Sequence, residues 1–190
     1  WGVYVLLTLL ETILLMFGGM SLFDSVCHSF ATMATGGFST KQASIAAWPS
    51  PYIQYVIALF MFLAGTNFTL LYFAGKGKFA RMFRDEEFRY YFLFVLGFTV
   101  LIFSGLLITS TLPAENAFRD SLFTVVSIIT TTGFVTADYL MWSPVLYMLV
   151  FILFFFGGST GSTGGGIKIM RIVLLLKNSY YELRRIIHPS

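Results

Sequence analysis

Two short stretches rich in threonine and glycine could supply the oxygen ligands of a dehydrated cation. β-Branched threonines favour extended backbone, and glycines permit unusual backbone dihedral angles. Carbonyl oxygens lined up around an axis can replace the hydration shell of an alkali cation, and threonine hydroxyls add further oxygens. The candidate filter residues are Ala34, Thr35, Gly36, Gly37 and Phe38 in the first stretch, and Thr130, Thr131, Thr132, Gly133 and Phe134 in the second. The alternative is an ordinary turn that joins two helices.

The chain contains two copies of one unit, which favours the filter interpretation over the ordinary turn. Residues that recur 96 positions later are Asp24, Ser25, Thr35, Gly37, Phe38 and Thr40, which match Asp120, Ser121, Thr131, Gly133, Phe134 and Thr136. Both units run in the same direction, so the repeats are expected to be related by a rotation axis along the membrane normal.

Composition indicates an integral membrane protein. Hydrophobic residues make up 57% of the chain, charged residues only 11%, and the mean hydropathy is +0.80. A spanning helix needs roughly 20 mostly apolar residues. The predicted organisation is repeat A over 1–89 (span 1–19, pore helix 22–34, filter 35–40, span 52–74, cytoplasmic loop 75–89) and repeat B over 90–190 (span 90–110, pore helix 118–130, filter 131–136, broken span 144–176, cytoplasmic end 177–190).

The basic residues predict the orientation of the chain in the membrane. Ten of the twelve lysines and arginines lie in 76–89 or 168–185, and only Lys41 and Arg119 lie elsewhere. By the positive-inside rule, the 75–89 loop and the C-terminal end are expected in the cytoplasm. Their juxtamembrane position favours this explanation over nucleic-acid binding, which is not expected.

The segments before the two stretches, 22–34 and 118–130, are too short to span the bilayer. Thirteen residues make roughly 20 Å of helix, which suits a re-entrant pore helix that enters from the outer side. The C-terminal end of a helix carries about half a negative charge, so such ends favour a cation where they converge. Asp24 and Asp120 lie near the start of these segments and are expected to cap them.

Six of the ten residues from 157 to 166 are glycine, which breaks the last span. Each glycine costs a helix interior about 1 kcal/mol relative to alanine, so the run disfavours helix by roughly 6 kcal/mol. We expect a gate loop that borders the ion path. Its residues are Gly157, Gly158, Ser159, Thr160, Gly161, Ser162, Thr163, Gly164, Gly165 and Gly166. Close helix packing and a phosphate-binding loop are the weaker alternatives.

Three segments, Thr-Gly-Gly-Phe-Ser-Thr (35–40), Thr-Thr-Thr-Gly-Phe (130–134) and the glycine run with Ile167 and Lys168, resemble the bacterial TrkH/KtrB potassium-uptake (Trk/Ktr/HKT) family. The resemblance implies four helix–pore-loop–helix repeats around one pore, of which this chain corresponds to the second and third. It implies one key filter glycine in each turn, Gly37 and Gly133, and an intramembrane gate at 157–166. It further implies a homodimer in the bacterial cytoplasmic (inner) membrane and a cytosolic nucleotide- or NAD-binding regulatory subunit.

The expected fold is therefore an all-α integral membrane protein, with parallel helix–pore-loop–helix repeats around a pore axis and a glycine-broken last span. The expected function is transmembrane potassium uptake by conduction through the filter, under control of the gate loop. A Na⁺- or H⁺-coupled potassium symporter and a non-conducting membrane scaffold subunit are the alternatives. No enzyme activity and no covalently bound cofactor are expected. K⁺ is the transported ion, and membrane lipid and the remaining repeats are the expected neighbours.

Overall fold

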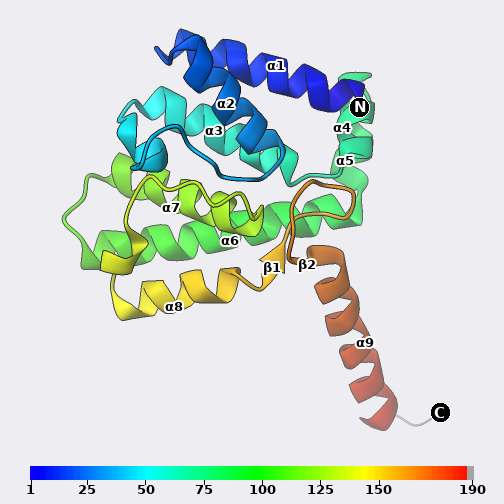
Figure 1. The fold of residues 1–190 in the computed structure, drawn as a ribbon. Coiled ribbons are helices and arrows are strands. Elements are labelled where there is room, and N and C mark those ends of the chain that lie inside the picture. The colour runs from blue at the N-terminus through cyan, green and yellow to red at the C-terminus, as the bar shows by residue number, and fades with distance from the viewer. Residues whose placement is uncertain (188–190) are drawn as a thin grey trace.

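The computed structural model describes residues 1–187, and helices dominate it (Figure 1). The helices are α1 (Gly2–Phe17), α2 (Leu22–Met33), α3 (Pro51–Ala64), α4 (Phe68–Gly75), α5 (Phe79–Arg84), α6 (Glu86–Thr109), α7 (Ala114–Ile129), α8 (Pro144–Leu153) and α9 (Ile169–Ile187). Two 3₁₀ turns, η1 (Ser44–Ala47) and η2 (Tyr139–Met141), and two short strands, β1 (Phe156–Gly157) and β2 (Ile167–Lys168), complete the order.

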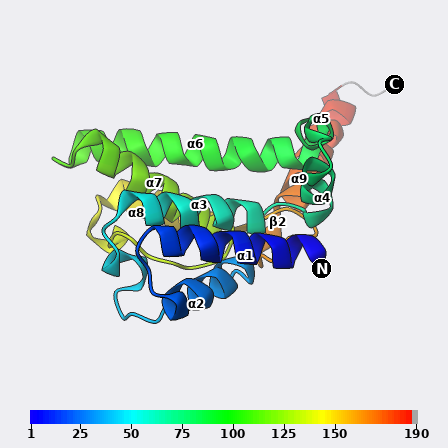
Figure 2. The same ribbon diagram turned by 90° about the horizontal axis from the view of Figure 1, so that it is seen from above.

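The helices form two groups that pack against each other. In Figure 1, α1, α2 and α3 lie in one group and α6, α7 and α8 in the other, and the contact between α3 and α7 joins them. Figure 2 shows α6 and α2 on opposite sides of the body, with α4 and α5 at one end. Helix α9 projects away from the body in Figure 1. Fully buried side chains such as Leu15, Ile57 and Phe123 form the core between the groups.

Helix α6 is the element most clearly long enough to cross a bilayer. It has 24 residues and contains an 18-residue stretch with a mean hydropathy of 2.5. Its length is about 36 Å, against a hydrocarbon core of about 30 Å. Helices α1 and α8 are apolar but shorter, with 16 and 10 residues. Large apolar side chains on α6, among them Leu93, Leu96 and Leu101, remain exposed. Such a surface suits contact with lipid or with other apolar helices.

The predicted span 52–74 is not one continuous helix, because the helix breaks after Ala64. Only together are helices α3 and α4 long and apolar enough to cross a bilayer, and they are bent by 110° at the break. The carbonyl of Gly65 accepts a hydrogen bond of 2.8 Å from the backbone N–H of Ser159. Beyond it, the side chain of Asn67 accepts from the N–H of Thr69 at 2.8 Å and caps the new helix. A helix-capping residue inside an apolar run is the signal for this bend.

Three other predicted segments and the predicted all-α fold class also differ from the structure. Helix α7 begins at Ala114 rather than 118. The predicted loop 75–89 contains the exposed helix α5 and the first turn of α6. Helix α9 continues through the predicted cytoplasmic end to Ile187. The fold is not purely α-helical, because β1 and β2 pair in parallel. Glycine permits this pairing, since a Cβ atom on Gly157 would lie 2.2 Å from the carbonyl oxygen of Gly165.

Candidate functional site

The first turn, residues 34–38, ends helix α2 with two characteristic hydrogen bonds. The N–H of Thr35 donates to the carbonyl of Thr32 at 2.9 Å, and that of Gly36 donates to Ala31 at 2.7 Å. This 5→2 and 6→1 pair is the Schellman motif, which satisfies carbonyls that a helix end would leave free. The motif needs a residue in the left-handed conformation, and Thr35 supplies it with a φ of 51°.

The second turn, residues 130–134, ends α7 in the same way. The N–H of Thr131 donates to the carbonyl of Ile128 at 2.9 Å, and that of Thr132 donates to Ser127 at 2.9 Å. Thr131 has a φ of 59°. The two segments that are related by sequence therefore share their local geometry as well.

The left-handed threonines are strained, and strain of this kind often marks a functional site. A β-branched residue at positive φ is a genuine outlier, since the left-handed region costs an L-residue roughly 1–2 kcal/mol. Such residues persist where the surrounding structure holds them, and they cluster at ligand sites. Thr35 is buried, and the hydroxyl of Thr131 accepts a hydrogen bond from another segment.

The two turns leave backbone oxygens free to bind a ligand. Within residues 1–187, no N–H or hydroxyl group donates to the carbonyls of Thr35, Gly36 and Thr131. Thr35 is buried, Thr131 is half-buried and Gly36 is exposed. A carbonyl without a partner in the protein needs water or a cation instead. They belong to the residues that the sequence marks as filter candidates.

The two turns lie directly against each other. A Cβ atom on Gly37 would lie 1.9 Å from the carbonyl oxygen of Thr132 and 3.2 Å from the carbonyl carbon of Gly133. Only glycine fits here, because any side chain would collide with the backbone of the opposite turn. Gly37 and Gly133 also have positive φ angles of 66° and 85°, yet a Cβ atom on Gly133 would meet no atom within 4 Å.

Side chains of α2 hold the end of the first turn. The ring of His28, which is fully buried, lies 2.9 Å from the hydroxyl of Ser39. The hydroxyl of Thr40 donates to Asp24 at 2.6 Å. This bond, together with one from Ser21, lowers the pKa of Asp24 below its usual range. The carboxylate therefore stays charged at this end of the turn.

The predicted capping roles of the two aspartates are only partly right. Ser21 is the N-cap of α2, where its hydroxyl oxygen accepts from the N–H of Asp24 at 3.1 Å. Asp24 lies in the first turn of the helix, where a carboxylate complements the dipole. Asp120 does not cap α7, because that helix begins six residues earlier at Ala114.

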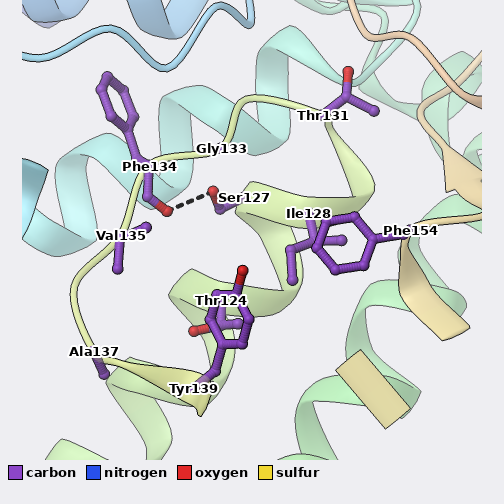
Figure 3. A pocket seen from close by; sticks show the side chains of 10 residues that line it. All are labelled: Thr124, Ser127, Ile128, Thr131, Gly133, Phe134, Val135, Ala137, Tyr139 and Phe154. Atoms are coloured by element: carbon purple, nitrogen blue, oxygen red, sulfur yellow. Dashed lines mark hydrogen bonds between the residues drawn. The ribbon is translucent and has the colours of Figure 1, made fainter. Parts of the chain in front are cut away.

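A buried serine fixes the second turn from behind. The hydroxyl of Ser127 donates to the carbonyl of Phe134 at 2.7 Å (Figure 3). Figure 3 also shows the cavity of about 280 Å³ beside this turn, between α7 and Phe154. The side chain of Phe134 is 2% exposed, whereas that of Phe38 in the first turn is 81% exposed. The second turn is therefore the more firmly anchored of the two.

We expect Ser127→Ala to weaken ion selectivity, because it frees the carbonyl of Phe134 and loosens the second turn. Loss of one hydrogen bond costs about 1 kcal/mol of stability. Ser121→Ala is the matched control, since the buried hydroxyl of Ser121 donates only within α7, to Ala117 at 2.6 Å. Thermal unfolding and cation competition should be measured for both variants. Equal selectivity in the two would contradict the role of Ser127.

The glycine-rich loop, residues 157–166, lies against the second turn. The N–H of Gly165 donates to the hydroxyl of Thr131 at 2.7 Å. A Cβ atom on Gly164 would lie 2.8 Å from the carbonyl oxygen of Thr130. The structure thus brings the predicted filter and the predicted gate loop into direct contact.

The same loop also contacts the break between α3 and α4. The N–H of Thr163 approaches the carbonyl of Ala64 at 3.4 Å, and the N–H of Phe68 donates to Gly161 at 3.3 Å. The sequence analysis did not predict this contact. Gly65 and Gly158 occupy matching positions in the two units once a short deletion in the second unit is allowed, so that they lie 93 rather than 96 positions apart. That matching pair of glycines was the available signal.

The site contains carbonyl and hydroxyl oxygens rather than the ligands of a transition metal. In the part of the chain that the structure describes, no three histidine, cysteine, aspartate or glutamate side chains come together to hold a metal ion. Neutral oxygen ligands suit alkali cations, which are bound by replacement of their hydration shell.

The chain has apolar helices with short helices between them, and two of the short helices end in an oxygen-rich turn. This arrangement defines a helical membrane protein. The family model for TrkH, described as a cation transport protein, matches residues 2–190. The chain belongs to the TrkH family, which confirms the resemblance drawn from the three sequence segments.

Individual relatives agree with this assignment. The chain is 39% identical to the Trk system potassium uptake protein TrkH of Halomonas elongata and 41% identical to that of Escherichia coli K12, over 100% of the chain. It matches the crystal structure of the potassium transporter TrkH from Vibrio parahaemolyticus with a TM-score of 0.95 and 36% identity, over 100% of the chain and 42% of that structure. The chain spans about 40% of the length of the two curated relatives.

Proposed function

We propose that the protein to which this chain belongs takes up potassium through a pore, and that the two turns contribute to its filter. One observation carries the proposal: two strained turns lie against each other with free carbonyl oxygens at Thr35, Gly36 and Thr131. The negative ends of α2 and α7 lead into these turns, which favours a cation there. The relatives named above as potassium uptake proteins support potassium as the ion.

The glycine-rich loop is proposed as the gate of this path. Its contacts with Thr130 and Thr131 support the proposal, because a loop at that place obstructs ions that leave the second turn. Its glycines allow it to change conformation at little steric cost. The loop lies against the second turn, and this position is proposed to be the closed state of the gate.

The rest of the assembly follows from the family. Two turns make half of a four-part ring, so remaining repeats of the same protein are proposed to complete the pore. The proposed setting is the bacterial inner membrane, with α5 and α9 on the cytoplasmic side, because these two helices carry six of the twelve lysines and arginines. A homodimer and a cytosolic nucleotide-binding regulatory subunit are proposed by resemblance alone.

A coupled symporter and a non-conducting scaffold remain the competing functions. Strict coupling to Na⁺ or H⁺ would require a second ion-binding site. A scaffold would not require carbonyl oxygens without a hydrogen-bond partner in the turns. The free oxygens of Thr35 and Thr131 favour conduction over the scaffold.

The test is uptake of rubidium-86 into liposomes that contain the full-length protein. Potassium should compete with rubidium far better than sodium or lithium does, because carbonyl rings compensate the dehydration of the larger ions. Flux that requires an imposed sodium or proton gradient would indicate the symporter. Absence of flux in the presence of the cytosolic partner would indicate the scaffold.

A further inference from the structure

One acidic side chain reaches the glycine-rich loop from a helix far away in the sequence. The Oε1 atom of Glu87, in the first turn of α6, accepts a hydrogen bond of 2.5 Å from the backbone N–H of Thr160. The two residues are 73 positions apart, and Thr160 lies in the middle of the loop. Neither the filter nor the glycines of the loop account for this contact.

A basic side chain holds the far end of the same loop. The ammonium group of Lys168, in β2, donates to the carbonyl of Gly164 and lies 3.3 Å from the hydroxyl of Ser162. Glu87 is close enough to attract this ammonium, whereas Arg171 repels it. Hydrogen bonds to charged groups are about twice as strong as those between neutral groups. The loop is therefore fixed at its middle and at its end by charges of opposite sign.

Glu87 lies on a longer and more regular element than the loop that it contacts. Glu87 lies on a helix of 24 residues that begins with an Asp85 cap on the N–H of Phe88 at 2.9 Å. The loop between β1 and β2 has six glycines in ten residues, and glycine brings little conformational restraint of its own. Contacts with residues outside the loop must then define its closed position. Among the residues that the structure describes, Glu87 and Lys168 make such contacts through charged groups.

We infer that Glu87 and Lys168 form a latch that holds the glycine-rich loop closed against the second turn. Glu87 holds the N–H of Thr160, and Lys168 holds the carbonyl of Gly164, next to Gly165, which contacts Thr131. Release of either contact lets the loop withdraw from the turn. The inference rests on the proposed role of the loop as a gate, and it names the side chains that regulate it.

The first test is rubidium-86 uptake by the full-length protein in liposomes without any cytosolic partner. Glu87→Ala should raise this basal uptake by about tenfold, the order expected for loss of one hydrogen bond to a charged group. Glu87→Gln should give a smaller rise, because its amide oxygen still accepts from Thr160. Glu86→Ala is the matched control: Glu86 contacts Lys177 on α9 rather than the loop, so basal uptake should not change.

A second readout separates the latch from the gate. A spin label at Thr160→Cys, in protein otherwise free of reactive cysteines, should become more mobile in Glu87→Ala and not in Glu86→Ala. A mobile label without a rise in uptake would contradict the gate and with it the regulatory role of the latch. An unchanged label and unchanged uptake, in protein that still takes up rubidium, would overturn the latch and leave the proposed function intact.

Discussion

Gly37→Ala should abolish most of the discrimination between potassium and sodium. The new methyl group would lie 1.9 Å from the carbonyl oxygen of Thr132, so the backbone of one turn must move. Overpacking of this kind costs about 1–3 kcal/mol, and the left-handed conformation at φ 66° adds roughly 1–2 kcal/mol for an L-residue. Because displaced carbonyls no longer fit one ion, we expect the preference for potassium to fall by about tenfold.

The same change at Gly133 is the matched comparison for this prediction. Gly133 has a positive φ of 85°, but a Cβ atom there would meet no atom within 4 Å. Gly133→Ala therefore carries the backbone cost without the collision, and its loss of selectivity should be smaller. Competition of sodium against rubidium-86 uptake measures both variants. A larger loss in Gly133→Ala would contradict the opposition of the two turns, and wild-type discrimination in both would contradict the filter.

Gly157→Ala should produce a leak through the unactivated protein. The methyl group would lie 2.2 Å from the carbonyl oxygen of Gly165 and 3.1 Å from the Cα atom of Gly166. The paired strands β1 and β2, which close the base of the glycine-rich loop, must then separate. A displaced loop no longer covers the second turn, so we expect basal rubidium uptake to rise by about tenfold, in line with an overpacking cost of about 1–3 kcal/mol.

Gly165→Ala is the control within the same loop. Its Cβ atom would meet the hydroxyl of Thr131 at 3.4 Å, an ordinary contact, and its N–H remains free to donate to that hydroxyl. The rise in uptake should therefore be much smaller than in Gly157→Ala. Thermal unfolding of both variants shows whether each is folded. A folded Gly157→Ala protein with wild-type basal uptake would contradict the role of the strand pair in closing the loop.

The sequence could single out the candidate site because its pattern occurs twice. A single Thr-Gly turn predicts little about function. Two such turns at matched positions, Thr35 with Thr131 and Gly37 with Gly133, predict that both serve the same function. The structure brings these turns together and gives them the same hydrogen bonds. Composition alone could not predict the left-handed threonines, because β-branched residues rarely adopt that conformation. The surrounding packing imposes it.

The features that the sequence did not reveal depend on contacts between distant residues. Hydropathy runs unbroken from 52 to 64 and resumes after Asn67, so a single span was the natural prediction. The helix breaks there because the glycine-rich loop, almost a hundred residues later, contacts Gly65 and Ala64. In the sequence, Glu87 is one of several charged residues in a juxtamembrane cluster. Its hydrogen bond with the N–H of Thr160 becomes visible only in the folded structure. Local patterns do not contain such contacts.

Cations are proposed to bind at the two opposed turns. Crystals of the full-length protein grown in rubidium should show an anomalous scattering peak beside the free carbonyls of Thr35, Gly36 and Thr131. The peak should be lost in Gly37→Ala crystals and should persist when sodium is added to the rubidium, because the site prefers the larger ion. A rubidium peak elsewhere, with no peak between the turns of a protein that transports rubidium, would contradict the account.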